Sequence, residues 1–335
     1  MVNKPLLQRI YERLAKHNIQ EAILAVNGLT AFYIKKQRIP KCGLHIKYSI
    51  DPPNKPLGTG GPIKKAERLI GDSDPFFVLN GDIYSELSYT GILTFHKKNK
   101  ALATIALCEV EDPTRYGVAE VTKKGRIKRF IEKPARGTSP TNLINAGIYV
   151  LNPEIFDYIP KEKKISMERE IFPKLVEEGK LFGYIINGLW MDIGKPEEYL
   201  QANRILLKKL ARLQQNERIN KFKLKAPVEM DKSVTIKPKT VIGPYAIVGR
   251  NVAIGGNVQI KNSVIFSDVE IEDGASINGA IIGESAKIGK DVKISRGCII
   301  GDQVKIKDNV SLTKKTAVCP GKEVTENILK SKIIC

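Results

Sequence analysis

Residues 234–306 decide the fold of the second half of the chain, and they read VTIKPKTVIGPYAIVGRNVAIGGNVQIKNSVIFSDVEIEDGASINGAIIGESAKIGKDVKISRGCIIGDQVKI. An aliphatic residue returns about every six positions, with an occasional step of five, and Gly, Asn, Asp and Ser fill the positions between. The aliphatic series is Ile236, Ile242, Val248, Ile254, Ile260, Ile265, Ile271, Ile277, Ile282, Ile288, Ile294, Ile300 and Ile306. Each short side of a triangular coil can point one aliphatic inward, while turn-forming residues bend the chain at the corners. Stacked coils then share one apolar core, so the stretch predicts a parallel β-helix built from hexapeptide repeats.

Parallel β-helices of this kind mediate self-association, and some transfer acyl groups from coenzyme A. The three histidines of the chain, His17, His45 and His96, all lie outside the repeats. An acyltransferase base is therefore missing from the β-helix. We expect it to hold subunits together, in a homo-oligomer or a hetero-oligomer.

The first 200 residues alternate between strand-like and helical runs. Candidate strands are 22–26, 45–50, 76–80, 103–110, 116–121, 127–133 and 144–151, and candidate helices are 5–17, 61–70, 89–99, 166–179 and 196–212. This alternation predicts an α/β, Rossmann-like domain with a mixed, mostly parallel sheet between helices. The expected division is a first domain over 1–203, a basic helical connector over 204–227, the β-helix over 228–320 and a C-terminal tail over 321–335.

The formal net charge is +19, which would attract polyanions such as RNA, anionic surfaces or nucleotides. A Lys-rich surface with Lys–Glu networks is the alternative interpretation. No motif combines basic and aromatic residues as nucleic-acid-binding modules do, so an RNA partner has no support beyond the charge. No apolar run is long enough for a membrane helix and the N-terminus is not a signal peptide, so we expect a cytoplasmic protein without a membrane partner. The five cysteines form no C-x-x-C pair, and we expect reduced thiols, mostly in the core.

Two aspartates stand out, one after the strand-like run of FFVLNGDIYSEL and one after the only Trp and before a helix in NGLWMDIGKPEEYL. In an open α/β sheet, ligands bind outside the carboxyl ends of the strands. Asp82 and Asp192 could therefore meet around a hard cation such as Mg²⁺, whose preferred ligands are oxygens. The alternatives are a turn or helix-cap role for each residue.

Three further motifs carry polar or Gly-rich positions. In KPLGTGGPIKKAERL, Gly58 precedes a helix and would let backbone amides approach a base or a phosphate. In RFIEKP, Glu132 and Lys133 end a strand, where they either serve a ligand or form a surface ion pair. In LINAGIYVL, Asn145 lies in an apolar strand, where its amide either fixes a turn or binds ligand hydroxyls.

Taken together and in this order, LGTGGP, LNGD, YGVAEV, RFIEKP, NAGIYVLNP, SMEREIFPKL and LWMDIGKPEEY resemble the sugar-1-phosphate nucleotidylyltransferases, or NDP-sugar pyrophosphorylases. The resemblance covers essentially the whole chain, including a left-handed β-helix at the C-terminus. SMEREIFPKL and LWMDIGKPEEYL most resemble the mannose-1-phosphate guanylyltransferase branch.

The resemblance implies roles by position. Asp82 and Asp192 match the aspartates that hold the catalytic Mg²⁺. Gly58 and Thr59 match the loop that contacts the base, and Lys133 matches the lysine on the sugar phosphate. Three residues match the positions beside the sugar, and these are Gly117, Glu132 and Asn145.

The implied reaction joins an NTP and a sugar 1-phosphate into an NDP-sugar, with GDP-mannose as the best candidate, and releases pyrophosphate. The family normally begins with a strand and a Gly-rich loop containing an arginine, and no such segment follows a first strand in these 335 residues. The implied alternatives are a catalytically impaired regulatory paralogue that binds a nucleotide sugar, or a subunit like those of the translation-initiation exchange factor.

Overall fold

The computed structural model describes residues 1–53, 55–72, 74–210, 217–219 and 222–335, with only the backbone described for 217–219. The chain forms two compact units. The α/β unit is Pro5–Asp192, and the solenoid unit combines Met1–Lys4 with Ile193–Cys335.

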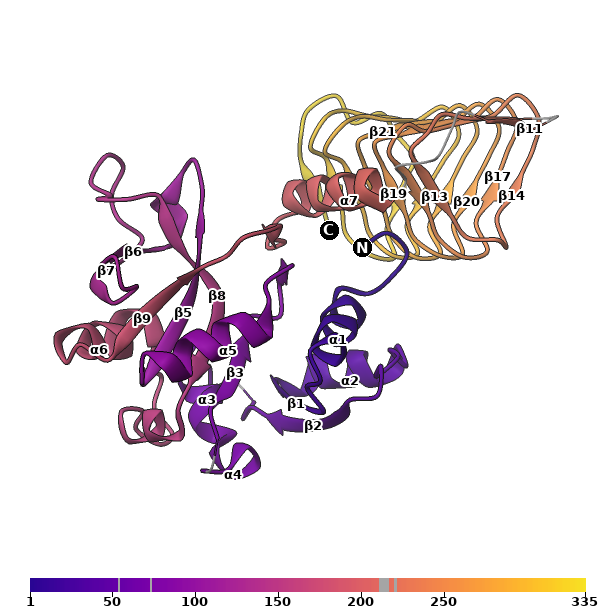
Figure 1. Ribbon diagram of the computed structural model, residues 1–335. Coiled ribbons are helices and arrows are strands. Elements are labelled where there is room, and N and C mark those ends of the chain that lie inside the picture. The colour runs from indigo at the N-terminus through magenta and orange to yellow at the C-terminus, as the bar shows by residue number, and fades with distance from the viewer. Residues whose placement is uncertain (54, 73, 211–216, 220–221) are drawn as a thin grey trace. The chain divides into compact units, whose positions relative to one another are not determined.

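The solenoid is a stack of coils whose strands form three faces (Figure 1), and the strands of each face pair in parallel except for the antiparallel pair β11–β12. Face 1 contains β11 (Glu217–Ile219), β12 (Phe222–Leu224), β15 (Val241–Ile242), β18 (Gln259–Lys261), β21 (Ser276–Asn278), β24 (Lys293–Ile294) and β27 (Ser311–Leu312). Face 2 contains β13 (Val228–Met230), β16 (Ala246–Val248), β19 (Val264–Ile265), β22 (Ile281–Ile282), β25 (Ile299–Ile300), β28 (Ala317–Val318) and β30 (Ile333–Ile334). Face 3 contains β14 (Thr235–Ile236), β17 (Ala253–Ile254), β20 (Glu270–Ile271), β23 (Lys287–Ile288), β26 (Lys305–Ile306) and β29 (Glu323–Val324).

The strand register confirms the predicted period. Ile242 pairs with Ile260, which pairs with Ile277 on the next coil. Face 3 repeats the pattern with Ile254 beside Ile271. Apart from half-buried Ile236, the predicted aliphatics are all buried in one continuous core. The parallel β-helix is confirmed, while its left-handedness stays a prediction.

Asn and Asp at the corners explain how the coils turn. Asn251, Asn257, Asp268, Asp291 and Asn309 adopt φ between 55° and 63°. Their short polar side chains tolerate this left-handed conformation better than most residues do. The corner chemistry predicted from the sequence is therefore present.

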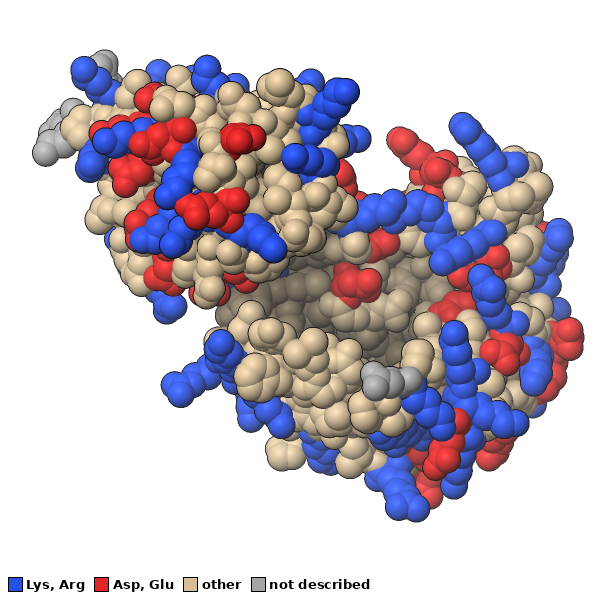
Figure 2. Space-filling view, turned by 180° about the vertical axis from the view of Figure 1, so that it is seen from behind, with Lys and Arg blue, Asp and Glu red and all other residues tan. Residues whose placement is uncertain are grey.

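Charges of both signs cover the solenoid face seen in Figure 2, at the upper left. On face 3, Lys287 lies 3.0 Å from Glu270, and Lys307 lies 2.7 Å from Glu323. This interspersion matches the Lys–Glu surface that was one interpretation of the net charge.

The domain division differs from the expected one. Helix α7 (Pro196–Leu210) belongs to the solenoid unit, with the Arg204 guanidinium 4.3 Å from the Tyr245 ring centre. The first compact unit ends at Asp192, whereas the expected first domain runs to residue 203, and that division stays a prediction. The predicted connector, 204–227, includes the end of α7 and strands β11 and β12, and its residues 211–216 and 220–221 lie outside the described part. The predicted tail, 321–335, continues the solenoid with β29 and β30.

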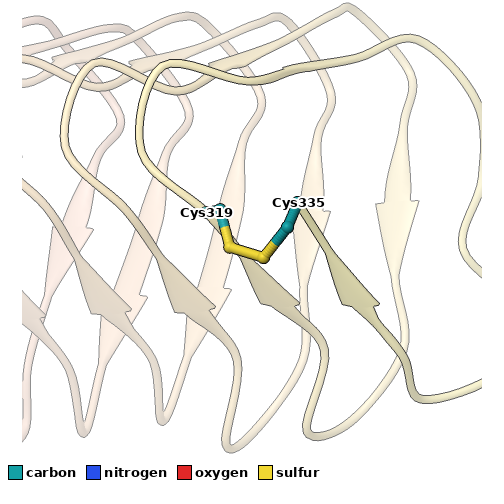
Figure 3. The surroundings of a disulfide bond; sticks show 2 residues. All are labelled: Cys319 and Cys335. Carbon is teal, nitrogen blue, oxygen red and sulfur yellow. A yellow bond between two sulfur atoms is a disulfide. The ribbon is translucent and has the colours of Figure 1, made fainter.

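A disulfide joins Cys319 to Cys335, so the expectation of five reduced thiols is wrong for this pair (Figure 3). Their Cα atoms lie 4.9 Å apart, because β28 and β30 run side by side and place the two residues next to each other. Among the others, Cys108 and Cys298 are buried thiols, as expected of small core residues, and Cys42 is half-buried.

The α/β unit contains the remaining elements. Its helices are α1 (Leu6–Lys16), α2 (Gly28–Lys36), α3 (Gly61–Lys65), α4 (Glu67–Ile70), α5 (Tyr89–Lys98) and α6 (Phe172–Glu177), with 3₁₀ turns η1 (Pro113–Arg115) and η2 (Pro153–Asp157) and a π-helical turn η3 (Met167–Ile171). Its strands are β1 (Glu21–Val26), β2 (His45–Ile50), β3 (Phe76–Leu79), β4 (Ile83–Ser85), β5 (Ala103–Glu109), β6 (Gly117–Val121), β7 (Ile127–Glu132), β8 (Leu143–Leu151), β9 (Leu181–Ile185) and β10 (Trp190–Asp192).

The main sheet is mixed, as predicted, but its strands are not mostly parallel. Its order is β7-β6-β8-β5-β9, with β3 also paired to β8. Among the described pairings of this sheet, only β5–β9 is parallel. Strands β1 and β2 form a separate parallel pair, and β4 and β10 a separate antiparallel pair. The alternation of elements predicted a layered α/β unit but could not give the direction of each strand.

Two apolar clusters make up the core of the α/β unit. One contains Ile10 and Leu14 of α1, together with Ile92 of α5. The other packs Phe172 and Leu175 of α6 against the sheet. In the described residues, no helix is both long and apolar enough to span a membrane.

Candidate active site

Asp82 and Asp192 come together through the pairing of β4 with β10. Asp82 lies in the turn before β4, and Asp192 ends β10 directly opposite Ile83. The two aspartates are therefore neighbours across the strand pair, although 110 positions separate them in the printed sequence. The register thus brings the backbones of the two residues close together.

Aromatic residues fix the position of β10. The Trp190 indole donates a hydrogen bond to the Ala146 carbonyl oxygen over 2.9 Å. Its ring meets that of Tyr116 edge to face, with 5.7 Å between ring centres. The Tyr116 hydroxyl donates to the Asp192 carboxylate at 3.2 Å. Asp192 is thus oriented from β10 and from the residue before β6.

The two carboxylates fit Mg²⁺ better than a metal caged by protein. No cluster of three or more His, Cys, Asp or Glu side chains suitable for a metal is found in the described ranges. Mg²⁺ usually binds through one or two carboxylates, with waters and substrate phosphates as its other ligands. Two carboxylates would therefore suffice for that ion.

The loop around Gly58 is tied to the segment before η3. Gly58 has φ of +74°, and a Cβ at this position would overlap the Ile165 carbonyl oxygen. The Ile165 amide donates to the Leu57 carbonyl at 3.0 Å, and the Gly60 amide donates back to the Ile165 carbonyl at 2.8 Å. Only glycine meets both the conformational and the steric requirement. The neighbouring Thr59 is exposed.

Strands β6, β7 and β8 bring three predicted residues into one row. Gly117 pairs with Glu132 across β6 and β7, and Val118 pairs with Ile144 across β6 and β8. Asn145 therefore lies beside Gly117. A Cβ on Gly117 would come within 2.8 Å of the Glu132 carboxylate, so that carboxylate lies over the glycine.

Glu132 and Lys133 differ in environment, as strand alternation predicts. Glu132 is half-buried, and burial, reinforced by the charge of Glu168, raises the pKa of its carboxyl. Lys133 is exposed, has φ of 49°, and donates its backbone amide to the Tyr116 carbonyl at 3.0 Å. No carboxylate lies within ion-pair distance of Lys133 among the described residues. The surface ion pair considered for this lysine is therefore not found.

Asn145 uses its side chain to shape its own strand. Its carbonyl oxygen accepts from the Gly147 amide at 2.9 Å, and its Nδ2 donates to the Tyr149 hydroxyl at 3.1 Å. Gly147 has φ of +69°, with Asn80 packed where a side chain would be. The side chain thus holds the backbone of β8 at Gly147, within a strand and not in a turn, and binding of ligand hydroxyls by Asn145 stays a prediction.

Three residues to which no role was assigned from the sequence complete the site, and these are Tyr116, Tyr149 and Glu168. Glu168 accepts from Thr59 Oγ1 at 2.6 Å and from the Tyr149 hydroxyl at 3.3 Å. Together, Glu168, Tyr149 and Tyr116 connect the predicted residues to one another. SMEREIFPKL held Glu168 within a recognised motif, but no local pattern indicated its partners.

Comparison with known proteins places this chain in a family. The family profile described as "Nucleotidyl transferase" matches residues 1–209, and that described as "GMPPB C-terminal domain" matches 224–334. The chain belongs to the nucleotidyl transferase family.

Curated relatives of this nucleotidyl transferase are similar over nearly the full chain. A mannose-1-phosphate guanyltransferase from Yarrowia lipolytica is 37% identical, and mannose-1-phosphate guanylyltransferase 1 from Arabidopsis thaliana is 32% identical. Each alignment covers 99% of this chain and 92% of the relative. The crystal structure of HddC from Yersinia pseudotuberculosis complexed with GMP-PN is 30% identical, with a TM-score of 0.50, covering 59% of this chain and 84% of that one.

Proposed function

We propose that this chain transfers a guanylyl group from GTP to mannose 1-phosphate, forming GDP-mannose and releasing pyrophosphate. The names of its relatives support this reaction, and so does the guanine-containing ligand of HddC. The observation in the chain itself that carries the proposal is the register that sets Asp192 opposite Ile83, next to Asp82.

In this proposal, Asp82 and Asp192 hold Mg²⁺, which supplies positive charge against the crowded phosphates. Lys133 binds the phosphate of the sugar 1-phosphate, since its side chain is exposed and has no ion-pair partner among the described residues. Gly58 and Thr59 contact the base.

The row formed by Gly117, Glu132 and Asn145 faces the sugar. The half-buried Glu132 carboxylate accepts hydrogen bonds from sugar hydroxyls, and Gly117 allows the sugar to approach the backbone. Asn145 retains a second Nδ2 hydrogen for a hydroxyl. An oxygen of the sugar phosphate attacks the α-phosphate and pyrophosphate leaves in line, so no protein nucleophile is needed.

The test is pyrophosphate release with Mg²⁺ and each pairing of GTP, ATP, CTP or UTP with mannose or glucose 1-phosphate. We expect turnover with GTP and mannose 1-phosphate, and a loss of about 10²-fold or more in Asp192→Asn, the size of effect seen when a group stabilising phosphate charge is removed. Asp157→Asn, an exposed carboxylate in η2, is the control. GDP-mannose binding without turnover by any pair would instead support the regulatory paralogue.

We also propose that copies associate through face 2 of the solenoid. Its outward column beyond α7 is apolar, with Ile281 and Ile299 half-buried and Ile333 74% exposed. Ile247 and Val264 lie in the same column, in a pocket that α7 also lines. There they are only 2% and 6% exposed. Sedimentation velocity of the purified chain distinguishes an oligomer from a monomer.

A cytoplasmic location also stays a prediction.

A further inference from the structure

A chain of hydrogen bonds joins the loop at Gly58 to strand β8. At one end, Thr59 Oγ1 donates to Glu168 Oε2 at 2.6 Å and accepts from the Met167 amide at 2.9 Å. At the other end, the Tyr149 hydroxyl donates to Glu168 Oε1 at 3.3 Å. Asn145 Nδ2 in turn donates to that hydroxyl at 3.1 Å. Each oxygen of the Glu168 carboxylate therefore serves a different part of the site.

The residues along this hydrogen-bond path are held rigidly. Tyr149 is 2% exposed and meets Phe172 edge to face, with 5.2 Å between ring centres. Ser166 caps η3 and donates its hydroxyl to Glu168 Oε2 at 2.8 Å. Glu168 itself lies in a π-helical turn, an uncommon conformation that is frequent at functional sites. Donor and acceptor roles are consistent along the whole path, which favours cooperative strengthening.

The two ends of the path correspond to the two substrates of the proposed reaction. Thr59 belongs to the loop assigned to the base, whereas Asn145 belongs to the row assigned to the sugar. The charge of Glu168 also reaches Glu132 in that row, since it contributes to the raised pKa of the Glu132 carboxyl. The sequence path between the ends is long, but the hydrogen-bond path contains only Glu168 and Tyr149.

We propose that Glu168 is a positioning residue that couples the base loop to the sugar row, so that the two substrate sites adopt their binding geometry together. This inference rests on the proposed function for the identity of the two ligands. The coupling itself is a property of the ligand-free chain. Coupling of this kind is demonstrated when a change at one end of the path alters the other end.

The first test is amide hydrogen exchange in the ligand-free protein, with two reporters. The Gly60 amide donates to Ile165, near the loop end, and the Gly147 amide donates to Asn145, at the strand end. Thr59→Val should speed exchange at Gly147 roughly tenfold, although Thr59 makes no hydrogen bond to β8, a change typical of coupled sites. Glu168→Gln should speed both reporters. Unchanged exchange at Gly147 in Thr59→Val overturns the proposal.

Glu170→Gln is the matched control. Glu170 is in the same π-helical turn, and its carboxylate accepts from the Ser166 amide at 2.9 Å, not from Thr59 or Tyr149. It should leave the Gly147 reporter unchanged, and that reporter alone is compared, because the Ser166 amide shares a peptide group with the Ile165 carbonyl that accepts from Gly60. The amides pairing β5 with β9 serve as an internal reference, because a general loss of stability would speed them as well.

The second test measures GTP affinity by calorimetry and the KM for mannose 1-phosphate in the same variants. Glu168→Gln should weaken both by a similar factor of about ten, and Glu170→Gln neither. Weakening of only one ligand contradicts the coupling. If the unmodified chain binds neither ligand, the proposed function fails, while the exchange experiment still decides whether Glu168 couples the two segments.

Discussion

At the scale of single residues, the site combines positions that sequence motifs revealed with others that they could not reveal. Asp82 was found because it follows a strand-like run, and Asp192 because it lies between the only Trp and a predicted helix. Tyr149 and Glu168 were missed because their partners are distant in sequence and neither residue differs locally from core or surface positions. A motif identifies a residue, whereas its hydrogen-bond partners depend on the register of the folded sheet.

Gly58 gives a prediction at this scale. Gly58→Ala should raise the Kd for GTP about tenfold or more, because the new methyl group must displace the Ile165 carbonyl and with it the base loop. Gly43→Ala is the matched control: its φ is +83° but nothing lies within 4 Å of the added Cβ. Gly43→Ala should lose about 1–2 kcal/mol of stability from the left-handed backbone, and Gly58→Ala should lose more because of the added clash, as measured by chemical denaturation. Equal GTP affinity in the two variants would show that the contact with Ile165 is unimportant.

His96 gives a second prediction, on pH. The ring is 1% exposed and lies 2.9 Å from Thr104 Oγ1 and 3.0 Å from Asn152 Oδ1, and burial lowers the pKa of its imidazole. Below pH of about 6.5 the unfolded chain takes up a proton that the folded chain resists, so stability falls as the pH drops through that value. Thermal unfolding between pH 8 and pH 5 measures the slope.

His96→Gln should flatten that slope, because its amide does not titrate. His45→Gln, at an exposed position on β2, controls for the loss of an imidazole. A steep slope that persists in His96→Gln would assign the pH dependence to other groups.

At the scale of elements, the solenoid was predictable and the α/β sheet was only partly so. Each coil repeats the same local requirement, so residues such as Ile254 and Ile271 reveal their neighbours through the period alone. The direction of β8 relative to β5 is set by connections that no local pattern describes. Helix α2 was missed because it has no apolar stripe to bury: Leu29 and Phe32 are 67% and 59% exposed, and only Ala31 is buried.

Strand β20 gives a prediction at this scale, because Glu270 and Ile271 point to opposite sides of face 3. Ile271 is 3% exposed, and Ile271→Ala should cost about 2–5 kcal/mol through lost burial and a cavity. Glu270→Ala removes the ion pair with Lys287, whose side chain is 56% exposed, and should change stability little. Chemical denaturation compares the two variants, and similar losses would mean that this ion pair stabilises the solenoid as much as the buried Ile271 side chain does.

At the scale of the whole molecule, the C-terminal end of the solenoid was the part least visible in the sequence. The aliphatic period continues through Leu312, Val318 and Val324, but residues 325–332 break it before β30. The pairing of Cys319 with Cys335 follows from the stacking of coils and would have been predictable had this segment been recognised as part of the stack.

Reduction of this disulfide should loosen only the final coil. The Ala317 and Cys319 amides donate to Lys332 and Ile334, at 3.0 Å and 2.8 Å. With a reductant, or in Cys335→Ser, exchange of these two amides should accelerate, because closing a loop of this length is worth about 3 kcal/mol. The Lys287 amide, on an inner coil, should not respond. Acceleration throughout the solenoid would show that its coils unfold as one unit.

Among the described strands, each coil of the solenoid pairs with the coil before it and the coil after it. A pulling force applied at the C-terminus would therefore peel the stack one turn at a time instead of breaking it at once. The Cys319–Cys335 bond closes the turn that would come away first. Under tension, the oxidised chain would gain length only from residues before Cys319, and the reduced chain would also release its last turn.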